Sequence, residues 1–167
     1  MAEVEHTGYI AHVRQDGNSW HTHELKDHLA GVSALAACFA RSMGEEWARV
    51  AGLWHDLGKY APPFQSMIRR ESGYDPEAHI EQGPRNHSTA GAIHAIDQLG
   101  PAGRALAYLI AGHHAGLPDW HGDTNAAAAL SHRLADRRHL EVLSTQDIPS
   151  DILHPPLPAI PRIPGGQ

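Results

Sequence analysis

Histidine is the residue that this sequence uses most unusually, and its placement indicates chemistry. The chain has 15 histidines, more than its 13 lysines and arginines together. Imidazole binds transition-metal ions readily. The candidates fall at inward-facing positions or at the ends of predicted helices: His28, His55 with Asp56, His87, and His113 with His114. Burying unpaired imidazoles costs free energy, so several that converge are expected to share a partner.

Two of these candidates are pairs of adjacent residues, which have a special geometry on a helix. Successive side chains point about 100° apart. His55 and Asp56 can therefore reach opposite sides of one metal site, or the carboxylate can bridge two ions that each keep imidazoles of their own. His113 and His114 allow the same arrangement at the end of another helix.

Apolar residues at helical spacing define the elements that must position these side chains. We expect helices at about 24–43, 45–58, 86–99, 106–113 and 125–143, and a shorter amphipathic segment after Pro62 and Pro63. Residues 9–13 alternate only weakly, as a short extended piece would. The inward face of the first helix is expected to carry Leu25, Leu29, Val32, Ala36 and Phe39. Helices without a convincing strand predict an all-α fold, a compact bundle.

Length and composition limit the class of protein. The chain has 167 residues and a net charge of −6, which suits one domain and does not indicate a strong nucleic-acid surface. It has neither a run of about 18 apolar residues nor an export signal, so we expect a cytoplasmic protein with no membrane partner. Cys38, the single cysteine, is expected in the core. Prolines gather after residue 148, which predicts a helical domain over 1–145 and a proline-rich C-terminal tail or linker over 146–167, without a helix of its own.

Six sequence blocks resemble one known family. They occur in the order YIAHVR (9–14), DHL (27–29), LWHDLGKY (53–60), FQ (64–65), NHSTAGA (86–92) and IAGHHAGLPD (110–119). Together they resemble the HD-type nuclease domain of the CRISPR-associated helicase-nuclease of type I systems, most closely the type I-C branch. The resemblance implies an HD-superfamily helical bundle, which agrees with the helices expected above.

The resemblance also implies roles for individual residues. The first metal ion would be held by His28, His55 and Asp56, and the second by Asp56, His87, His113 and His114, with Asp56 as the bridge. Mixed imidazole and carboxylate ligands suit two divalent transition-metal ions such as manganese, iron, nickel or cobalt. A metal-activated hydroxide would then hydrolyse phosphodiester bonds of single-stranded DNA. The partners implied are that DNA and the helicase portion or the CRISPR surveillance complex.

Three residues beside the ligands have alternative roles. Lys59 resembles a family lysine that stabilises phosphate charge or a bound hydroxide, or it is a solvated lysine at a helix end. Ser88 and Thr89 would bind a substrate phosphate, or they would only cap the third long helix. Five arginines would line a path for the strand: Arg69, Arg70, Arg133, Arg137 and Arg138.

The sequence departs from the family at one ligand. The family supplies a further aspartate to the first metal ion from a later helix, and that pattern does not occur here. Asp136 is a candidate replacement, and the chain is interpreted as a truncated version of the domain. Three functions remain open: a single-strand DNA nuclease, a catalytically weak interaction or regulatory module of a CRISPR complex, and an HD phosphohydrolase acting on nucleotides.

Overall fold

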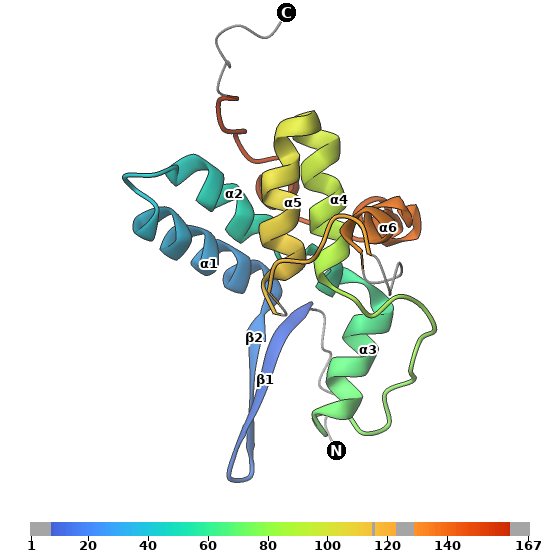
Figure 1. Ribbon diagram of the computed structural model, residues 1–167. Coiled ribbons are helices and arrows are strands. Elements are labelled where there is room, and N and C mark those ends of the chain that lie inside the picture. Colours follow the sequence, from blue (N-terminus) through green and yellow to red (C-terminus); the bar gives the residue numbers. More distant parts are fainter. Residues whose placement is uncertain (1–7, 115, 123–128, 161–167) are drawn as a thin grey trace, which may run out of the picture.

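The computed structural model describes residues 8–114, 116–122 and 129–160, which form a helical bundle with a projecting hairpin (Figure 1). The elements in chain order are β1 (Ile10–Asp16), β2 (Ser19–Glu24), α1 (Leu25–Phe39), α2 (Glu45–Trp54), the 3₁₀ turn η1 (Leu57–Tyr60), α3 (Pro62–Glu71), α4 (Ser88–Leu99), η2 (Gly100–Ala102), α5 (Gly103–Gly112), α6 (Leu130–Ala135), η4 (Arg137–Leu140), α7 (Glu141–Thr145) and α8 (Ser150–Leu153). The expected all-α bundle is confirmed, with a two-stranded sheet added to it. In the described part of the chain, no helix has the length and apolar character needed to cross a membrane.

The helices α1 and α2 form a hairpin that packs through small residues. Leu25, Leu29, Ser33 and Ala37 are the buried positions of α1, at regular intervals of four. A Cβ atom on Gly52 of α2 would lie only 2.5 Å from the Ser33 Cα atom. The two backbones therefore approach each other as closely as a glycine allows, and this contact fixes the C-terminal half of α2 against α1.

This packing corrects the predicted inward face of α1. The buried line runs through Ser33 and Ala37, one residue away from the expected Val32 and Ala36. As a result the Phe39 side chain is 81% exposed and Cys38 lies at the surface, so the prediction of a core cysteine is wrong. The helix also ends at Phe39, several residues before the expected end.

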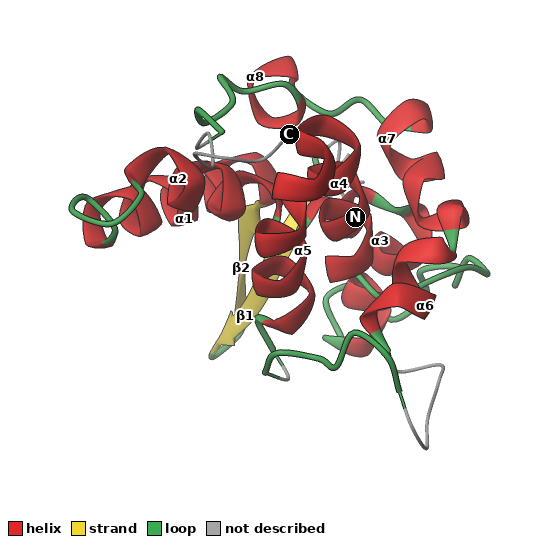
Figure 2. Cartoon of the chain, turned by 45° about the horizontal axis from the view of Figure 1, so that its top comes forward, coloured by secondary structure: helices red, strands yellow, loops and turns green. Residues whose placement is uncertain are grey.

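The helices α4 and α5 form a second pair, which stands across the end of α2 (Figure 2). A Cβ atom on Gly91 would collide with the backbone carbonyl oxygen of Trp54. Trp54 is fully buried, and the next residue in the chain is His55. Because His87 is one helical turn before Gly91, this close approach brings the start of α4 to the end of α2.

The hairpin of β1 and β2 was not expected as a sheet. Its strands are antiparallel, with His12 opposite His23, and they are joined through Gly17 at φ 58° and the following asparagine. The extended character expected at residues 9–13 is confirmed, but the second strand was missed. Most side chains of the hairpin are exposed on both faces, so the alternation of polar and apolar residues that normally predicts a strand is lacking.

The C-terminal part of the chain contains short elements where one long helix was expected. Of the predicted helix at 125–143, residues 125–128 lie outside the described residues, and the rest contributes to α6, η4 and the start of α7. Ile148 and Ile152 then belong to the hydrophobic core, and the Trp54 indole N–H donates to the Ile152 carbonyl oxygen at 3.0 Å. The expectation of no helix after residue 145 is corrected by the single turn α8. The division at residue 145 itself stays a prediction.

Candidate metal centre

Asp56 lies at the centre of the molecule, and its two carboxylate oxygens face two different groups of histidines. It is separated from the last residue of α2 by His55, directly precedes η1, and is 2% exposed. Its Oδ2 atom lies 3.2 Å from His28 Nε2 and 3.1 Å from His55 Nε2. Its Oδ1 atom lies 3.5 Å from His87 Nε2 and 3.4 Å from His113 Nε2. One carboxylate therefore joins α1 and α2 on one side to α4 and α5 on the other.

The candidate ligand atoms form two groups that share Asp56. His28, His55 and Asp56 make up the first group, and Asp56, His87, His113 and His114 make up the second; within each group the atoms lie within 4.8 Å of one another. The structure thus brings together all six residues singled out in the sequence. Their assignment as ligands of particular ions stays a prediction.

Backbone carbonyls orient two of the imidazoles. The His55 Nδ1 atom lies 2.8 Å from the Gly52 carbonyl oxygen, and the His113 Nδ1 atom lies 2.7 Å from the Ile110 carbonyl oxygen. A carbonyl oxygen only accepts, so each Nδ1 carries the proton, and in the neutral imidazole each Nε2 keeps the lone pair that a metal ion beside Asp56 would bind. This is the arrangement in which a metal-binding histidine is usually held.

The geometry fits divalent metal ions. Two imidazole nitrogens bound about 2.1 Å from one ion and 90° apart would be about 3.0 Å from each other. The His28 and His55 Nε2 atoms are 3.2 Å apart, and the His87 and His114 Nε2 atoms are 2.9 Å apart. The Asp56 Oδ1 atom is buried and has no hydrogen-bond partner in the described part of the chain. A cation between these groups would supply the missing partner.

The pKa shifts of Asp56 and His87 agree with a metal site. Burial raises the pKa of the Asp56 carboxyl, but its contacts with His113, His28 and His55 lower it more strongly, so the pKa lies far below its usual range. Burial lowers the pKa of the His87 imidazole to about 4, and the charge of Lys59 adds to this effect. At neutral pH the carboxylate is therefore ionised, and His87 is neutral and able to donate a lone pair.

Lys59 is part of this centre and is not a solvated lysine. Its side chain is buried, and its Nζ atom donates to Asp56 Oδ2 at 2.9 Å and to the Ala11 carbonyl oxygen at 3.2 Å. Gln65 supports this contact from α3, because its amide donates to the carbonyl oxygens of Ile10 and Lys59. The reading of Lys59 as a solvated helix-end residue is wrong, while its action on substrate stays a prediction.

The hydroxyls of Ser88 and Thr89 are occupied inside the protein. Both donate to the Asn86 side-chain oxygen, which also accepts the backbone N–H groups of Ser88 and Thr89. Asn86 is therefore the residue that caps α4, in place of either hydroxyl residue. Both hydroxyl oxygens also accept from Arg133 at 3.0 and 3.1 Å. Substrate binding by Ser88 and Thr89 stays a prediction.

Asp136 and most of the predicted arginine path make contacts elsewhere. The Asp136 carboxylate accepts from Arg138 at 2.7 and 2.8 Å, and it belongs to neither histidine group. Arg137 makes a two-bond pair with Asp97 on α4. Arg69 donates to the carbonyl oxygens of residues 8 and 65. Because of these contacts, the arginines do not form a continuous unpaired row that leads to the metal centre.

Two histidines of the hairpin stand next to the centre. The His12 and His23 ring centroids lie 4.7 and 5.6 Å from that of His28. His12 belongs to the YIAHVR block of the resemblance, whereas His23 lies outside all of its blocks. Their cross-strand pairing is the signal that links them, and it required the second strand to be recognised. A further histidine, His94, lies away from the centre, where it is buried and bonded to the Leu153 carbonyl oxygen.

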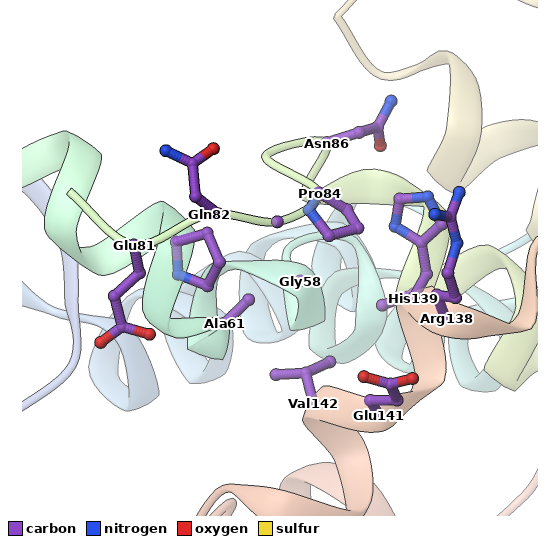
Figure 3. A pocket seen from close by; sticks show the side chains of 13 residues that line it. Gly58, Ala61, Glu81, Gln82, Pro84, Asn86, Arg138, His139, Glu141 and Val142 are labelled. Atoms are coloured by element: carbon purple, nitrogen blue, oxygen red, sulfur yellow. The ribbon is translucent and has the colours of Figure 1, made fainter.

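A separate pocket of about 270 Å³ lies between residues 81–86, η1 and the segment from η4 to α7 (Figure 3). Its floor includes Ala61 and Val142, and Glu81, Arg138 and His139 stand at its sides. None of the six clustered residues lines it. The pocket and the metal centre are therefore distinct features, although two lining residues, Gly58 and Asn86, lie close in sequence to Asp56 and His87.

The fold and the site together define a class of protein. A helical bundle that gathers imidazoles around a central His–Asp pair has the ligands of a metal-dependent hydrolase. The chain belongs to the HD domain family, whose model matches residues 25–142, from the first residue of α1 into α7. All six clustered residues lie within that match. HD domains are typically metal-dependent phosphohydrolases. A search of curated proteins found no match to this chain.

Proposed function

We propose that the chain is a metal-dependent nuclease that hydrolyses phosphodiester bonds of single-stranded DNA in type I CRISPR interference. The single observation that supports this most is the division of the Asp56 carboxylate between two histidine groups. Such a division is suited to two divalent ions, manganese, iron, nickel or cobalt. Bound ions of this kind polarise a phosphoryl oxygen and lower the pKa of water.

The protein's own residues prepare this centre for a phosphodiester. His28, His55 and Asp56 would hold the first ion, and Asp56, His87, His113 and His114 would hold the second. Lys59 fixes the Oδ2 side of the shared carboxylate through its 2.9 Å contact. His114 is exposed, so the second group opens to the surface, where a continuous strand can pass. An open site favours a polymer over a small nucleotide that must be enclosed.

Support for DNA as the substrate comes from the resemblance of the HDLGK, HSTAGA and GHHAGLPD blocks to the nuclease domain of the type I helicase-nuclease. The net charge of −6 and the internal pairing of Arg137 and Arg138 give the chain little general attraction for DNA. In this proposal a helicase portion or the CRISPR surveillance complex, in the cytoplasm, brings the strand to the site.

One observation favours a second candidate, a catalytically weak interaction module. Leu35, Phe39 and Met43 follow one another at intervals of four, and their side chains are 60%, 81% and 85% exposed. An exposed apolar row of this kind is common at protein interfaces. The two candidates differ in whether the metal centre turns over substrate.

Cleavage of circular single-stranded DNA distinguishes them. The metal-free chain is supplied with manganese, nickel or cobalt and compared with Asp56→Asn and with Asp136→Asn, an equivalent change at an aspartate outside both groups. We expect cleavage by the wild type and by Asp136→Asn, and none above background by Asp56→Asn. A wild type no faster than Asp56→Asn would refute the nuclease and favour the interaction module. Faster hydrolysis of nucleoside monophosphates than of DNA would instead indicate a nucleotide phosphohydrolase.

A further inference from the structure

Arg133 connects the two segments that carry the second histidine group. From α6, its Nη2 atom donates to the hydroxyls of Ser88 and Thr89 at 3.0 and 3.1 Å, and its Nη1 atom donates to the Ala111 carbonyl oxygen at 3.4 Å. Ser88 directly follows His87, and Ala111 is two residues before His113. One guanidinium therefore bridges the start of α4 and the end of α5, at the points where both helices approach Asp56.

The charge of Arg133 is unusual for a side chain that only packs. Arg133 is half-buried, its Nε atom has no hydrogen-bond partner, and no acidic side chain of the described residues pairs with it. Arg137, one turn further along, instead has a carboxylate partner in Asp97. Partial burial of an unpaired guanidinium costs free energy. A role in the neighbouring site would account for a cation that is kept there without a counter-charge.

We propose that Arg133 is a positioning residue that sets the distance between His87 on one side and His113 and His114 on the other, and so controls the affinity of the second ion. This inference rests on the part of the proposed function that assigns a second ion to this group. The distances that Arg133 would control are those from Asp56 Oδ1 to the Nε2 atoms of His87 and His113, which are 3.5 and 3.4 Å. A fork of fixed donors is suited to this task, because it can hold both segments at once.

The direction in which the affinity for the second ion changes distinguishes a positioning role of Arg133 from a purely electrostatic one. A fixed positive charge repels a nearby cation, so removing the charge alone would strengthen binding of the second ion. Removing the bridge would weaken it, because the ligands would no longer be held together. The first group is an internal reference, since His28 and His55 belong to α1 and the end of α2, and the hydrogen bonds of Arg133 go to Ser88, Thr89 and Ala111 instead.

Calorimetric titration of the metal-free chain with manganese or nickel tests the proposal. We compare the wild type with Arg133→Met, Arg133→Lys and Arg137→Met, the last of which removes an arginine that also bonds to α4 but far from the ligands. In Arg133→Met we expect the second binding step to weaken about 10-fold to 100-fold, as when an outer support of a metal ligand is lost. The first step stays unchanged, and Arg137→Met binds both ions like the wild type.

The lysine variant keeps the charge without the fork, so we expect it to weaken the second step as well. Urea unfolding of the metal-free chain shows whether the methionine variant folds. If it does not, the lysine variant alone still tests the proposal. The proposal would be overturned if either Arg133 variant bound the second ion as tightly as the wild type, or more tightly. An equal loss of affinity in Arg137→Met would also overturn it, and so would a wild type that shows no second binding step. Because the readout is metal affinity, a chain that binds two ions but cleaves no DNA would refute the nuclease and still support this role of Arg133.

Discussion

Gly58 is the position where one added methyl group would test how the fold holds the metal centre. Its backbone N–H donates to the His87 carbonyl oxygen at 3.0 Å, so η1 is tied directly to the residue that precedes α4. In Gly58→Ala the new Cβ atom would lie 2.5 Å from the His87 carbonyl oxygen and 2.6 Å from its Cα atom. Ordinary contact begins near 3.4 Å. Both partners are backbone, so the two segments must separate by roughly 1 Å.

The loss of stability expected in Gly58→Ala follows from this separation. Overpacking of a close contact costs about 1–3 kcal/mol, and the strained hydrogen bond contributes about 0.5–1.5 kcal/mol more. Restriction of the unfolded chain by alanine offsets about 0.4–1 kcal/mol. We expect the free energy of unfolding to fall by about 0.5–4 kcal/mol, which lowers Tm by roughly 1–16 °C for a domain of this size. His87 would move away from Asp56, so binding of the second ion should weaken too.

Thermal unfolding of the metal-free chain measures the first effect, and metal titration measures the second. Gly31→Ala is the matched control, because Gly31 lies inside α1 and a Cβ atom there would meet nothing within 4 Å. Alanine at that site should stabilise the helix by about 0.5–1 kcal/mol. If Gly58→Ala unfolded at the wild-type temperature and bound metal normally, the claim that η1 and His87 are in rigid contact would be wrong.

Three other changes probe the surroundings of the site. Trp54→Phe leaves the buried Ile152 carbonyl oxygen without its donor, and we expect urea unfolding to show a loss of about 1–3 kcal/mol. Lys59→Met breaks a buried ion pair with Asp56, and we expect a loss of about 3–5 kcal/mol in metal-free protein, partly recovered by added manganese. Burial lowers the pKa of His94, so below pH 6.5 the unfolded chain binds more protons there than the folded chain. Its contribution to stability is therefore present at neutral pH and is lost as the pH falls towards 5, and His94→Gln should flatten the measured decrease.

Each of these three predictions has an outcome that would contradict it. An unchanged urea midpoint in Trp54→Phe would mean that residues after 145 do not dock on α2. A Lys59→Met chain as stable as the wild type would mean that the lysine is hydrated in solution. An equally steep fall in stability between pH 7 and 5 in His94→Gln would assign the acid sensitivity to other histidines.

The six clustered residues were predictable because they depend on short-range signals. A helix that ends in His55 and Asp56, and another that ends in His113 and His114, present these side chains wherever the helices are packed. The sequence blocks around them repeat a family pattern, so their convergence was implied before any contact was known. What was missed depends on contacts between distant segments. The buried state of Lys59, for example, depends in part on the Ala11 carbonyl oxygen, which accepts from it across 48 residues of sequence.

Other errors arose because small and polar residues can mark a close contact. The buried line of α1 passes through Ser33, which faces Gly52, and through Ala37 one turn later, while hydrophobicity favoured Phe39. The hairpin gave no alternating pattern because both of its faces meet solvent. Near the C-terminus the prolines hid two core residues, Ile148 and Ile152, since the density of prolines says nothing about which side chains between them are buried.

The charges at the site explain how an acidic chain could bind the anionic DNA that we propose as its substrate. Asp56 brings one negative charge, Lys59 cancels it, and the surrounding histidines bring none when they are neutral. In the proposed dinuclear state the centre would therefore carry a local charge of about +4, the charge of the ions themselves. At physiological salt this field extends about 8 Å, so it acts on a phosphate at the site while the net charge of −6 repels DNA elsewhere on the surface. Affinity for DNA should then depend on bound metal, and removing the metal with a chelator should abolish binding as well as cleavage.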